Sequence, residues 1–250
     1  MWVRGRCVRN PLAHRRRAPG AGFLKTAFWD AGSLLCQTLV SWQYHFRVEG
    51  QSHIPPTGPA IFIANHQSLL DPVIHGLAVG DRAPRPMAKE ELFKNPLFGA
   101  VLRGLNCICV RSDGGNREAI RVALDELAAG RTVMLYPEGT RSSDGSVKEF
   151  RRGVELLARK SHAPIVPMGI DGAFDIWPAG RSLPRSHGRI WAAIGAPITA
   201  EQQVELFADS AAGLTHLQRR VTALMRHCRC QLRRATGETY PAVGVADEQF

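Results

Sequence analysis

The sequence predicts an α/β domain with a single, mostly parallel sheet flanked by helices. Short apolar runs with a strand pattern alternate with helical segments between residues 46 and 200, and this alternation is typical of parallel strands joined by right-handed crossovers. The chain has 250 residues, of which 44% are hydrophobic, which suffices to bury one substantial core. No internal repeat interrupts the pattern.

The formal net charge of +10 is concentrated toward the two ends of the chain. Residues 1–48 hold eight Lys or Arg and one acid, and residues 216–236 hold six Arg and no acid. The stretch 49–215 holds 18 basic and 18 acidic residues. A nucleic-acid or anionic-lipid binding module would explain the excess of positive charge, but the neutral middle argues against a basic binding face on the core.

Two N-terminal segments precede the α/β pattern, a basic arm at 1–22 and a predicted helix at 23–45. Apolar residues recur along this helix at steps of three and four: Leu24, Phe28, Ala31, Leu35, Leu39 and Trp42. This spacing gives one apolar face, and a basic arm before an amphipathic, aromatic helix is typical of a monotopic membrane anchor. The alternative is a helix that packs on the core. An Arg-rich, acid-poor leader also fits a mitochondrial transit segment, and no membrane-spanning helix is predicted.

The remaining elements follow in order. Strands are predicted at 46–50, 59–64, 85–89, 106–111, 132–136, 164–170 and 188–195, and helices at 68–79, 96–104, 116–129, 153–160 and 199–236, the last with a break at Gly213. The chain thus divides into the arm and amphipathic helix (1–45), the α/β domain (46–200), C-terminal helices packed on it (201–236) and a tail (237–250).

The six cysteines do not indicate a metal site. Cys107 with Cys109, and Cys228 with Cys230, form C-x-C pairs, which lack the C-x-x-C or Cys/His spacing of structural zinc sites. Buried free thiols in a reducing cytosol are therefore the expectation, and no metal is predicted.

The stretch Asn65–Asp71 carries the clearest chemistry. His66 follows the predicted strand 59–64, and open α/β sheets bind their ligands at the carboxyl ends of strands. Asp71, five residues later, can reach back to the imidazole and fix its tautomer, as in a catalytic triad without a serine nucleophile. His66 is therefore predicted to be a general base. The alternative is an ordinary loop histidine before a helix that Ser68 caps.

Other predicted strands end in groups that suit a phosphate. Because the carboxyl ends of parallel strands share one edge, these groups are expected to converge, and the planar fork of arginine favours bidentate phosphate contacts. The residues are Arg111, Glu138, Gly139, Thr140, Arg141, Lys148, Arg151 and Arg152. The alternatives are structural: Arg111 is solvated or pairs with Asp113, Arg141 pairs with Glu138 or Asp144, Gly139 serves only the turn, and the other cations form a solvated face.

These motifs resemble the glycerolipid acyltransferases, a family that includes 1-acyl-sn-glycerol-3-phosphate acyltransferase. Asn65 to Asp71 matches its N-H-x-x-x-x-D motif, Arg111 its arginine after an apolar strand, and Glu138 to Ser142 its E-G-T-R-S loop. Phe150-Arg-Arg-Gly153 matches a basic segment in which lysine is usual at the second position, and Ile165-Val-Pro-Met168 matches the proline-containing strand. The resemblance covers residues 46–200 in the family order, although the second motif lacks the more common glycine and phenylalanine.

The resemblance implies an activity and its partners. A fatty acyl group would pass from acyl-CoA or acyl carrier protein, without a cofactor or metal, to the hydroxyl of a lysophospholipid, with lysophosphatidic acid giving phosphatidic acid. His66 would be the base, Asp71 would orient it, and Arg111 and Arg141 would hold the phosphate. An enzyme of this kind would bind the cytosolic face of an anionic membrane as a peripheral or monotopic protein. Other acceptors such as a lyso-ornithine lipid, or a catalytically silent lipid-binding protein, are the alternatives.

Overall fold

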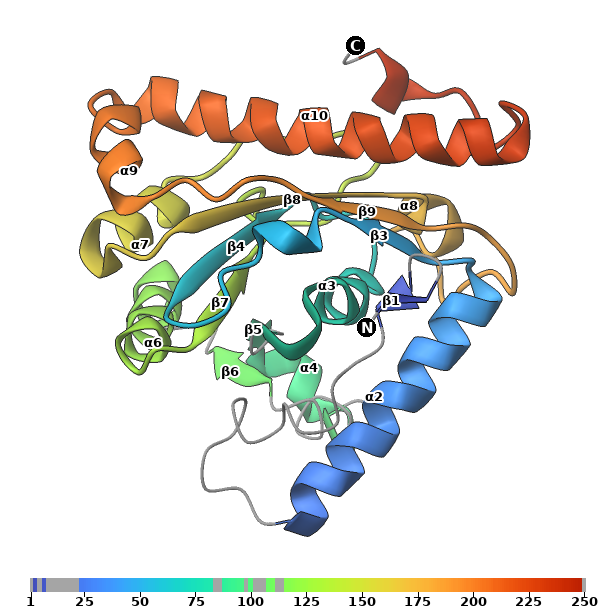
Figure 1. The fold of residues 1–250 in the computed structure, drawn as a ribbon, viewed down its shortest axis with the longest axis horizontal. Helices are drawn as coiled ribbons and strands as arrows, with labels where there is room; N and C mark the ends of the chain where they lie inside the picture. The colour runs from blue at the N-terminus through green and yellow to red at the C-terminus, as the bar shows by residue number, and fades with distance from the viewer. Residues whose placement is uncertain are drawn as a thin grey trace.

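The computed structural model describes residues 2–3, 6–7, 23–82, 87–96, 99–100, 107–110 and 115–248. A five-stranded sheet with the order β3–β9–β8–β4–β7 forms its centre (Figure 1). The strands are β3 (Arg47–Glu49), β4 (Ala60–Ala64), β7 (Thr132–Leu135), β8 (Ile165–Asp171) and β9 (Trp191–Ile194). β4, β7 and β8 run parallel, whereas β9 is antiparallel to β8 and parallel to β3. The predicted α/β fold with a mostly parallel sheet is confirmed.

The sequence of β4 shows why both faces of this sheet are covered. Ala60, Phe62 and Ala64 pack into one hydrophobic cluster, whereas Ile61 and Ile63 pack into another. Successive side chains of a strand point to opposite faces. An uninterrupted apolar run is therefore what a strand covered on both faces requires.

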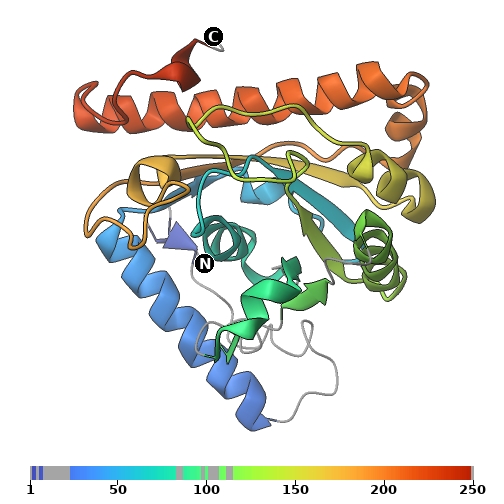
Figure 2. The same ribbon diagram turned by 180° about the vertical axis from the view of Figure 1, so that it is seen from behind.

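Two groups of helices supply this cover (Figures 1 and 2). The C-terminal part of α2 (Phe23–Gln43) and α3 (Asp71–Val79) lie on the face that carries Phe62. α6 (Gly115–Ala128), α7 (Gly153–Ser161) and α10 (Ser210–Thr236) lie on the other face. α10 crosses β8 so closely that a Cβ atom on Gly169 would lie 2.4 Å from the backbone nitrogen of Met225.

Shorter elements complete the chain. They are β1 (Trp2–Val3), β2 (Arg6–Cys7), η2 (Gln51–His53), η3 (Gly80–Arg82), β5 (Met87–Lys89), α4 (Glu90–Lys94), β6 (Ile108–Val110), α8 (Ala173–Ile176), α9 (Ala200–Leu206) and η4 (Val245–Asp247). β5 and β6 pair with each other as a separate two-stranded sheet, so these two predicted strands do not join the central one. Most of the helix predicted at 96–104 and most of the arm 1–22 lie outside the described residues.

The predicted helix break at Gly213 is wrong. α9 begins after a capping box at Thr199, and α10 begins after Asp209, whose carboxylate accepts the backbone N–H groups of Ala211 and Ala212. The turn between these helices therefore lies at residues 207–209. Gly213 is inside α10, where a Cβ atom would lie 2.5 Å from the carbonyl oxygen of Leu206. Its function is close packing, which a glycine permits in a helix as well as in a turn.

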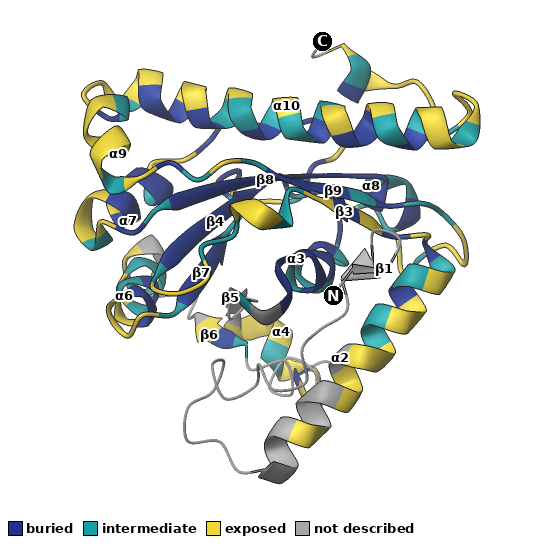
Figure 3. Cartoon of the chain, in the orientation of Figure 1, coloured by how far each residue is buried: buried dark blue, intermediate teal, exposed yellow. Residues whose placement is uncertain are grey.

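Four further features concern the surface, the C-terminal segment, the cysteines and the helix lengths. Figure 3 shows buried strands between helices whose outer sides are exposed. Residues 237–248 are not a loose tail, because the Tyr240 hydroxyl donates to the Gly172 carbonyl oxygen at 3.0 Å and Arg229 contacts Asp247. Cys228 is buried as expected, but Cys109 and Cys230 are exposed free thiols. No helix in the described ranges combines the length and apolar character needed to cross a membrane.

Candidate active site

Asn65 joins the end of β4 to β8. Its amide nitrogen donates to the Ile170 carbonyl oxygen, and its amide oxygen accepts the Ile170 N–H, both at 2.9 Å. The side chain is fully buried. Because an asparagine amide carries both a donor and an acceptor, it continues the pairing of the two strands by one residue. This pairing fixes the position at which the loop that begins with His66 leaves the sheet.

The predicted contact between His66 and Asp71 is confirmed. His66 Nδ1 lies 2.7 Å from Asp71 Oδ2, and the same oxygen accepts the backbone N–H groups of Gln67 at 2.6 Å and Ser68 at 2.7 Å. A carboxylate oxygen only accepts hydrogen bonds, so Nδ1 carries the proton and Nε2 keeps its lone pair. Asp71 is fully buried, whereas the His66 side chain is 18% exposed. This is the geometry of an oriented general base.

Ser68 does not cap α3, so this alternative from the sequence is wrong. The helix begins at Asp71, and the preceding Leu70 makes no side-chain cap. The Ser68 hydroxyl instead accepts the Leu70 N–H at 3.2 Å and donates to the Trp177 carbonyl oxygen at 2.9 Å. The Ser68 hydroxyl therefore connects the loop of His66 to the segment that follows α8.

Glu138 joins the loop after β7 to the loop after β4. Its two carboxylate oxygens accept the backbone N–H groups of His66 at 2.8 Å and Lys148 at 3.0 Å, and the Ser142 N–H donates to the His66 carbonyl oxygen at 2.7 Å. The expected convergence of these two loops is thus confirmed. Burial raises the pKa of Glu138 to about 7, although both N–H groups act to lower it.

The cations predicted to hold a phosphate surround the same loop. Gly139 has a φ of 73°, and a Cβ atom there would lie 2.8 Å from Arg151 Nε, so the Arg151 side chain packs across this glycine. Arg141 is partly exposed, while Thr140, Arg151 and Arg152 are exposed. Lys148 Nζ lies 3.4 Å from the Ser143 hydroxyl. Arg111 lies outside the described residues.

Tyr136 and His75 lie behind the candidate base. The Tyr136 ring stacks on the His66 ring with a centroid separation of 4.1 Å and an interplanar angle of 21°. The Tyr136 hydroxyl lies 3.0 Å from His75 Nδ1. Burial lowers the pKa of His75 to about 4, so this imidazole is neutral at pH 7. The stack restricts the plane of the His66 ring.

A buried polar chain connects the loop to α10. The Gln67 amide nitrogen donates to Asp171 at 3.1 Å, and Arg229 of α10 donates to the other oxygen of the same carboxylate at 3.0 Å. Arg229 also contacts Asp247 at 2.8 Å. Because Asp171 is fully buried and Arg229 is nearly so, their charges depend on each other for stabilisation.

Five of these residues were not predicted from the sequence: Gln67, His75, Tyr136, Asp171 and Arg229. His75 lies four residues after Asp71, a spacing that places two side chains on one helix face, so it alone had a local signal. The others come together only through strand pairing and helix packing. The described residues hold no cluster of three or more His, Cys, Asp or Glu side chains that could bind a metal ion.

Comparison with known proteins places this geometry in a family. A family model described as Acyltransferase matches residues 45–171. A chloroplastic 1-acyl-sn-glycerol-3-phosphate acyltransferase of Arabidopsis thaliana is 29% identical over 158 residues, which are 62% of this chain and 44% of that protein. The alpha form of this enzyme from Mus musculus is 32% identical over 176 residues, 67% of this chain and 61% of that protein. The chain spans about half the length of the curated relatives it matches.

A solved structure shares the fold. The crystal structure of the 1-acyl-sn-glycerophosphate (LPA) acyltransferase PlsC from Thermotoga maritima superimposes with a TM-score of 0.67 at 28% identity. The match covers 82% of this chain and 79% of that one. The similarity therefore extends beyond the matched family segment.

Glu138 predicts a specific dependence of stability on pH. Its pKa of about 7 in the folded state exceeds the ordinary glutamate pKa of 4.5, so the folded protein binds this proton more tightly than the unfolded chain does. The protonated Glu138 side chain therefore contributes its full stabilisation of the folded state below pH 4.5, and this contribution is lost as the pH rises through 7. Glu138→Gln should remove this loss, on the order of 2–3 kcal/mol, so its unfolding free energy should decline less than that of the parent between pH 5 and pH 8.

Urea unfolding at several pH values measures this difference. Glu149→Gln is the matched control, because Glu149 is exposed in the same loop and should leave the pH dependence unchanged. Parallel pH profiles for the parent and Glu138→Gln would refute the raised pKa of this carboxyl. If the unfolding free energies of the two proteins differ by the same amount at every pH, that difference reflects only the altered hydrogen bonding of the amide and not a raised pKa.

Proposed function

Because this chain belongs to the Acyltransferase family, we propose that it is an O-acyltransferase that acylates a lysophospholipid. The donor is an acyl thioester, acyl-CoA or acyl carrier protein, and the acceptor is 1-acyl-sn-glycerol-3-phosphate, which gives phosphatidic acid. The observation that supports this most directly is the Asp71–His66 contact of 2.7 Å beside the loop that Glu138 holds. The names of the relatives and of the solved structure supply the substrate class.

The proposed reaction needs one base and no covalent enzyme intermediate. His66 Nε2 takes the proton of the acceptor hydroxyl while its oxygen attacks the thioester carbonyl carbon. The tetrahedral intermediate collapses, the C–S bond breaks, and the imidazolium returns the proton to the leaving thiolate. Asp71 stabilises the imidazolium through the Nδ1–H bond and fixes the tautomer, as the acid does in a catalytic triad. A thioester is already activated, so this mechanism requires no metal or cofactor.

The basic side chains around the Glu138–Ser142 loop suit the acceptor phosphate. Positive charge comes from Arg141, Lys148, Arg151 and Arg152. At the turn, Gly139 offers its backbone and Thr140 its hydroxyl. Arg111 has the corresponding role by its motif. Glu138 contributes by position, because its two oxygens accept backbone N–H groups. It thereby holds the loop beside His66.

α2 is proposed to bind a membrane surface on its cytosolic side. Four large apolar side chains of this helix face away from the protein: Leu34, Leu35, Leu39 and Trp42 are 65%, 59%, 51% and 75% exposed. The opposite side packs on the domain through Val40. The face predicted from the sequence is thus not used for core packing at its described positions 31, 35, 39 and 42. An exposed apolar helix face of this kind suits the interfacial plane of a bilayer.

His66→Ala tests the proposed base. Acyl transfer should fall by roughly 10²–10⁴ or more, because general-base assistance contributes that much to the rate. Release of the thiol from acyl-CoA is measured with lysophosphatidic acid as acceptor, and circular dichroism checks the fold. His216→Ala is the control, since His216 is exposed on α10 and should retain full activity. Full activity in His66→Ala would exclude this base, and no turnover by the parent would favour a silent lipid-binding protein.

Arg141→Ala tests phosphate binding. The KM for lysophosphatidic acid should rise on the order of tenfold or more, the loss expected for a charge-assisted hydrogen bond. The KM for the acyl donor should stay the same. Arg219→Ala, an exposed arginine of α10, should leave both constants unchanged. An unaltered acceptor KM in Arg141→Ala would argue against a phosphate contact.

Leu39→Asp tests the membrane role of α2. Binding to phospholipid vesicles should weaken at least severalfold, because a charge replaces an apolar side chain at the interface. Cosedimentation with the vesicles measures the bound fraction. Val204→Asp is a matched control, because Val204 is 73% exposed on α9, away from α2 in Figure 1. Equal binding by the two variants would contradict the assignment of this face.

A further inference from the structure

The loop between α8 and β9, residues 177–189, carries positive charge and contains no acid. It contains Arg181, Arg185, His187 and Arg189, and the segment 176–200 has no Asp or Glu. Arg181 and Arg185 are exposed. Arg185 lies close enough to the partly buried Asp175 to lower the pKa of that carboxyl, although burial has the larger, opposite effect. Both guanidinium groups are exposed and therefore accessible to an anionic partner.

Leu183 lies exposed among these cations. Its side chain is 73% exposed, close to the 75% of Trp42. Internal hydrogen bonds determine the course of the loop up to this residue: Trp177 Nε1 donates to the Arg181 carbonyl oxygen, and Arg181 Nε donates to the Leu183 carbonyl oxygen, both at 2.8 Å. The exposed leucine is thus held by its backbone in a defined loop.

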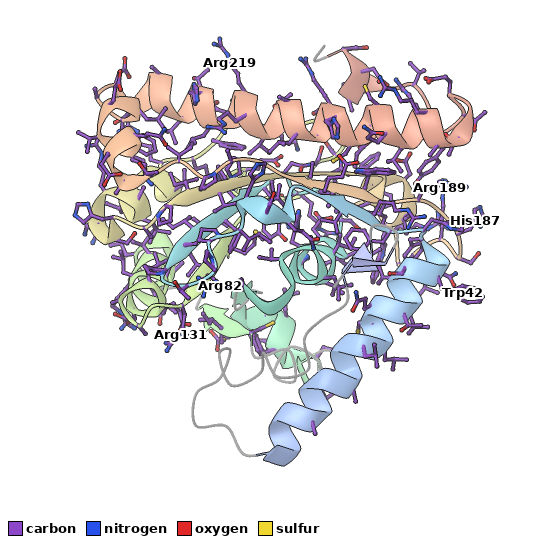
Figure 4. All side chains as sticks on the ribbon, in the orientation of Figure 1. Trp42, Arg82, Arg131, His187, Arg189 and Arg219 are labelled. Carbon is purple, nitrogen blue, oxygen red and sulfur yellow. The ribbon has the colours of Figure 1, made fainter. Side chains whose placement is uncertain are left out.

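The loop is attached to the C-terminal end of α2. The Tyr44 hydroxyl donates to the Arg185 carbonyl oxygen at 3.1 Å, and the Gln43 amide donates to the Ser186 carbonyl oxygen. Figure 4 shows Trp42, His187 and Arg189 at this end of the molecule, and Arg219 on the outer side of α10 across the sheet. Residues 31–48 contain no acid either. The loop and the C-terminal end of α2 therefore form one surface that combines exposed apolar side chains with positive charge.

This surface adjoins the candidate site. The Ser68 hydroxyl, between His66 and Asp71 in the sequence, donates to the Trp177 carbonyl oxygen at 2.9 Å. Trp177 is the first residue of the loop. The first residue of the loop is thus connected directly to the segment that positions His66.

We infer that loop 177–189 is a docking surface for an anionic lipid bilayer, additional to α2. Leu183 and Trp42 enter the interfacial region, and Arg181 and Arg185 bind lipid phosphates above it. Tryptophan is enriched at membrane interfaces, and arginine keeps its charged head in water while its stem lies on apolar groups. An acidic protein would match the cations but not an isolated leucine at a loop tip. The inference rests on the proposed function, because a membrane acceptor gives the surface its purpose.

Charge reversal tests the inference in the 250-residue chain. The parent protein, Arg181→Glu/Arg185→Glu and Arg219→Glu/Arg234→Glu are sedimented with vesicles of phosphatidylcholine alone and of phosphatidylcholine mixed with phosphatidylglycerol. The α10 variant has the same charge change at two exposed positions. The loop variant should bind mixed vesicles at least about tenfold more weakly than the parent, because cations near the surface supply the attraction. The α10 variant should bind as the parent does.

Two further measurements sharpen the result. Leu183→Asn keeps every charge and should weaken binding severalfold through the lost apolar contact. Parental binding should weaken as salt is raised, because screening reduces the attraction between charges near a surface. Equal loss in the loop and α10 variants, unchanged binding in the loop variant, or equal parental binding to both vesicle types would each overturn the inference.

Turnover of a soluble substrate separates this inference from the proposed function. Short-chain lysophosphatidic acid dispersed as monomers, with a short-chain acyl-CoA, requires no bilayer. The loop variant should match the parent in this assay. If the parent has no turnover while its vesicle binding depends on the loop, the proposed activity fails and the docking surface stands. If the loop variant loses soluble turnover as well, the loop acts on the site itself and the docking assignment is overturned.

Discussion

The carboxylate of Asp71 is the interaction on which the site depends. One of its oxygens accepts three N–H groups, from the His66 ring and from the backbone of Gln67 and Ser68. The same buried charge therefore closes the loop after β4 and sets the tautomer of the imidazole. A buried carboxylate is costly unless hydrogen bonds compensate it, and here those bonds define the reactive geometry. Loop folding and orientation of the base are consequences of one contact.

Other buried polar side chains connect this loop to the rest of the domain through hydrogen bonds. Asn65 joins it to β8, Glu138 joins it to the loop after β7, and Gln67 joins it to Asp171 and so to Arg229 of α10. Each connection pairs a side chain with a partner distant in sequence, so the site forms only when the sheet and α10 are in place. The stacking of Tyr136 on His66 adds an apolar contact that limits rotation of the ring. Rigid support of this kind suits a proton transfer that needs a fixed Nε2 position.

The distribution of charge and apolar surface complements the chemistry. The middle of the chain is neutral in total, yet the exposed apolar residues of α2 and the cations of loop 177–189 meet at one end of the molecule. Ser68 connects that end to the loop of the base. An enzyme that draws a lipid acceptor from a bilayer requires its reactive group close to the lipid surface. Under the proposed function, the hydrogen bond from Ser68 to Trp177 connects these two parts of the molecule.

The sequence alone determined the alternation of strands and helices, the pairing of His66 with Asp71 and the meeting of the loops after β4 and β7. These features depend on local periodicity, on a five-residue spacing and on the common edge of parallel strands. Tertiary structure alone decided the positions of Gly213, Glu138, Tyr136 and Arg229. Gly213 reads locally as a helix break but serves close packing against Leu206, and Glu138 reads as part of a ligand loop but accepts two backbone N–H groups. Their partners are brought near by strand pairing and helix packing, which no local pattern encodes.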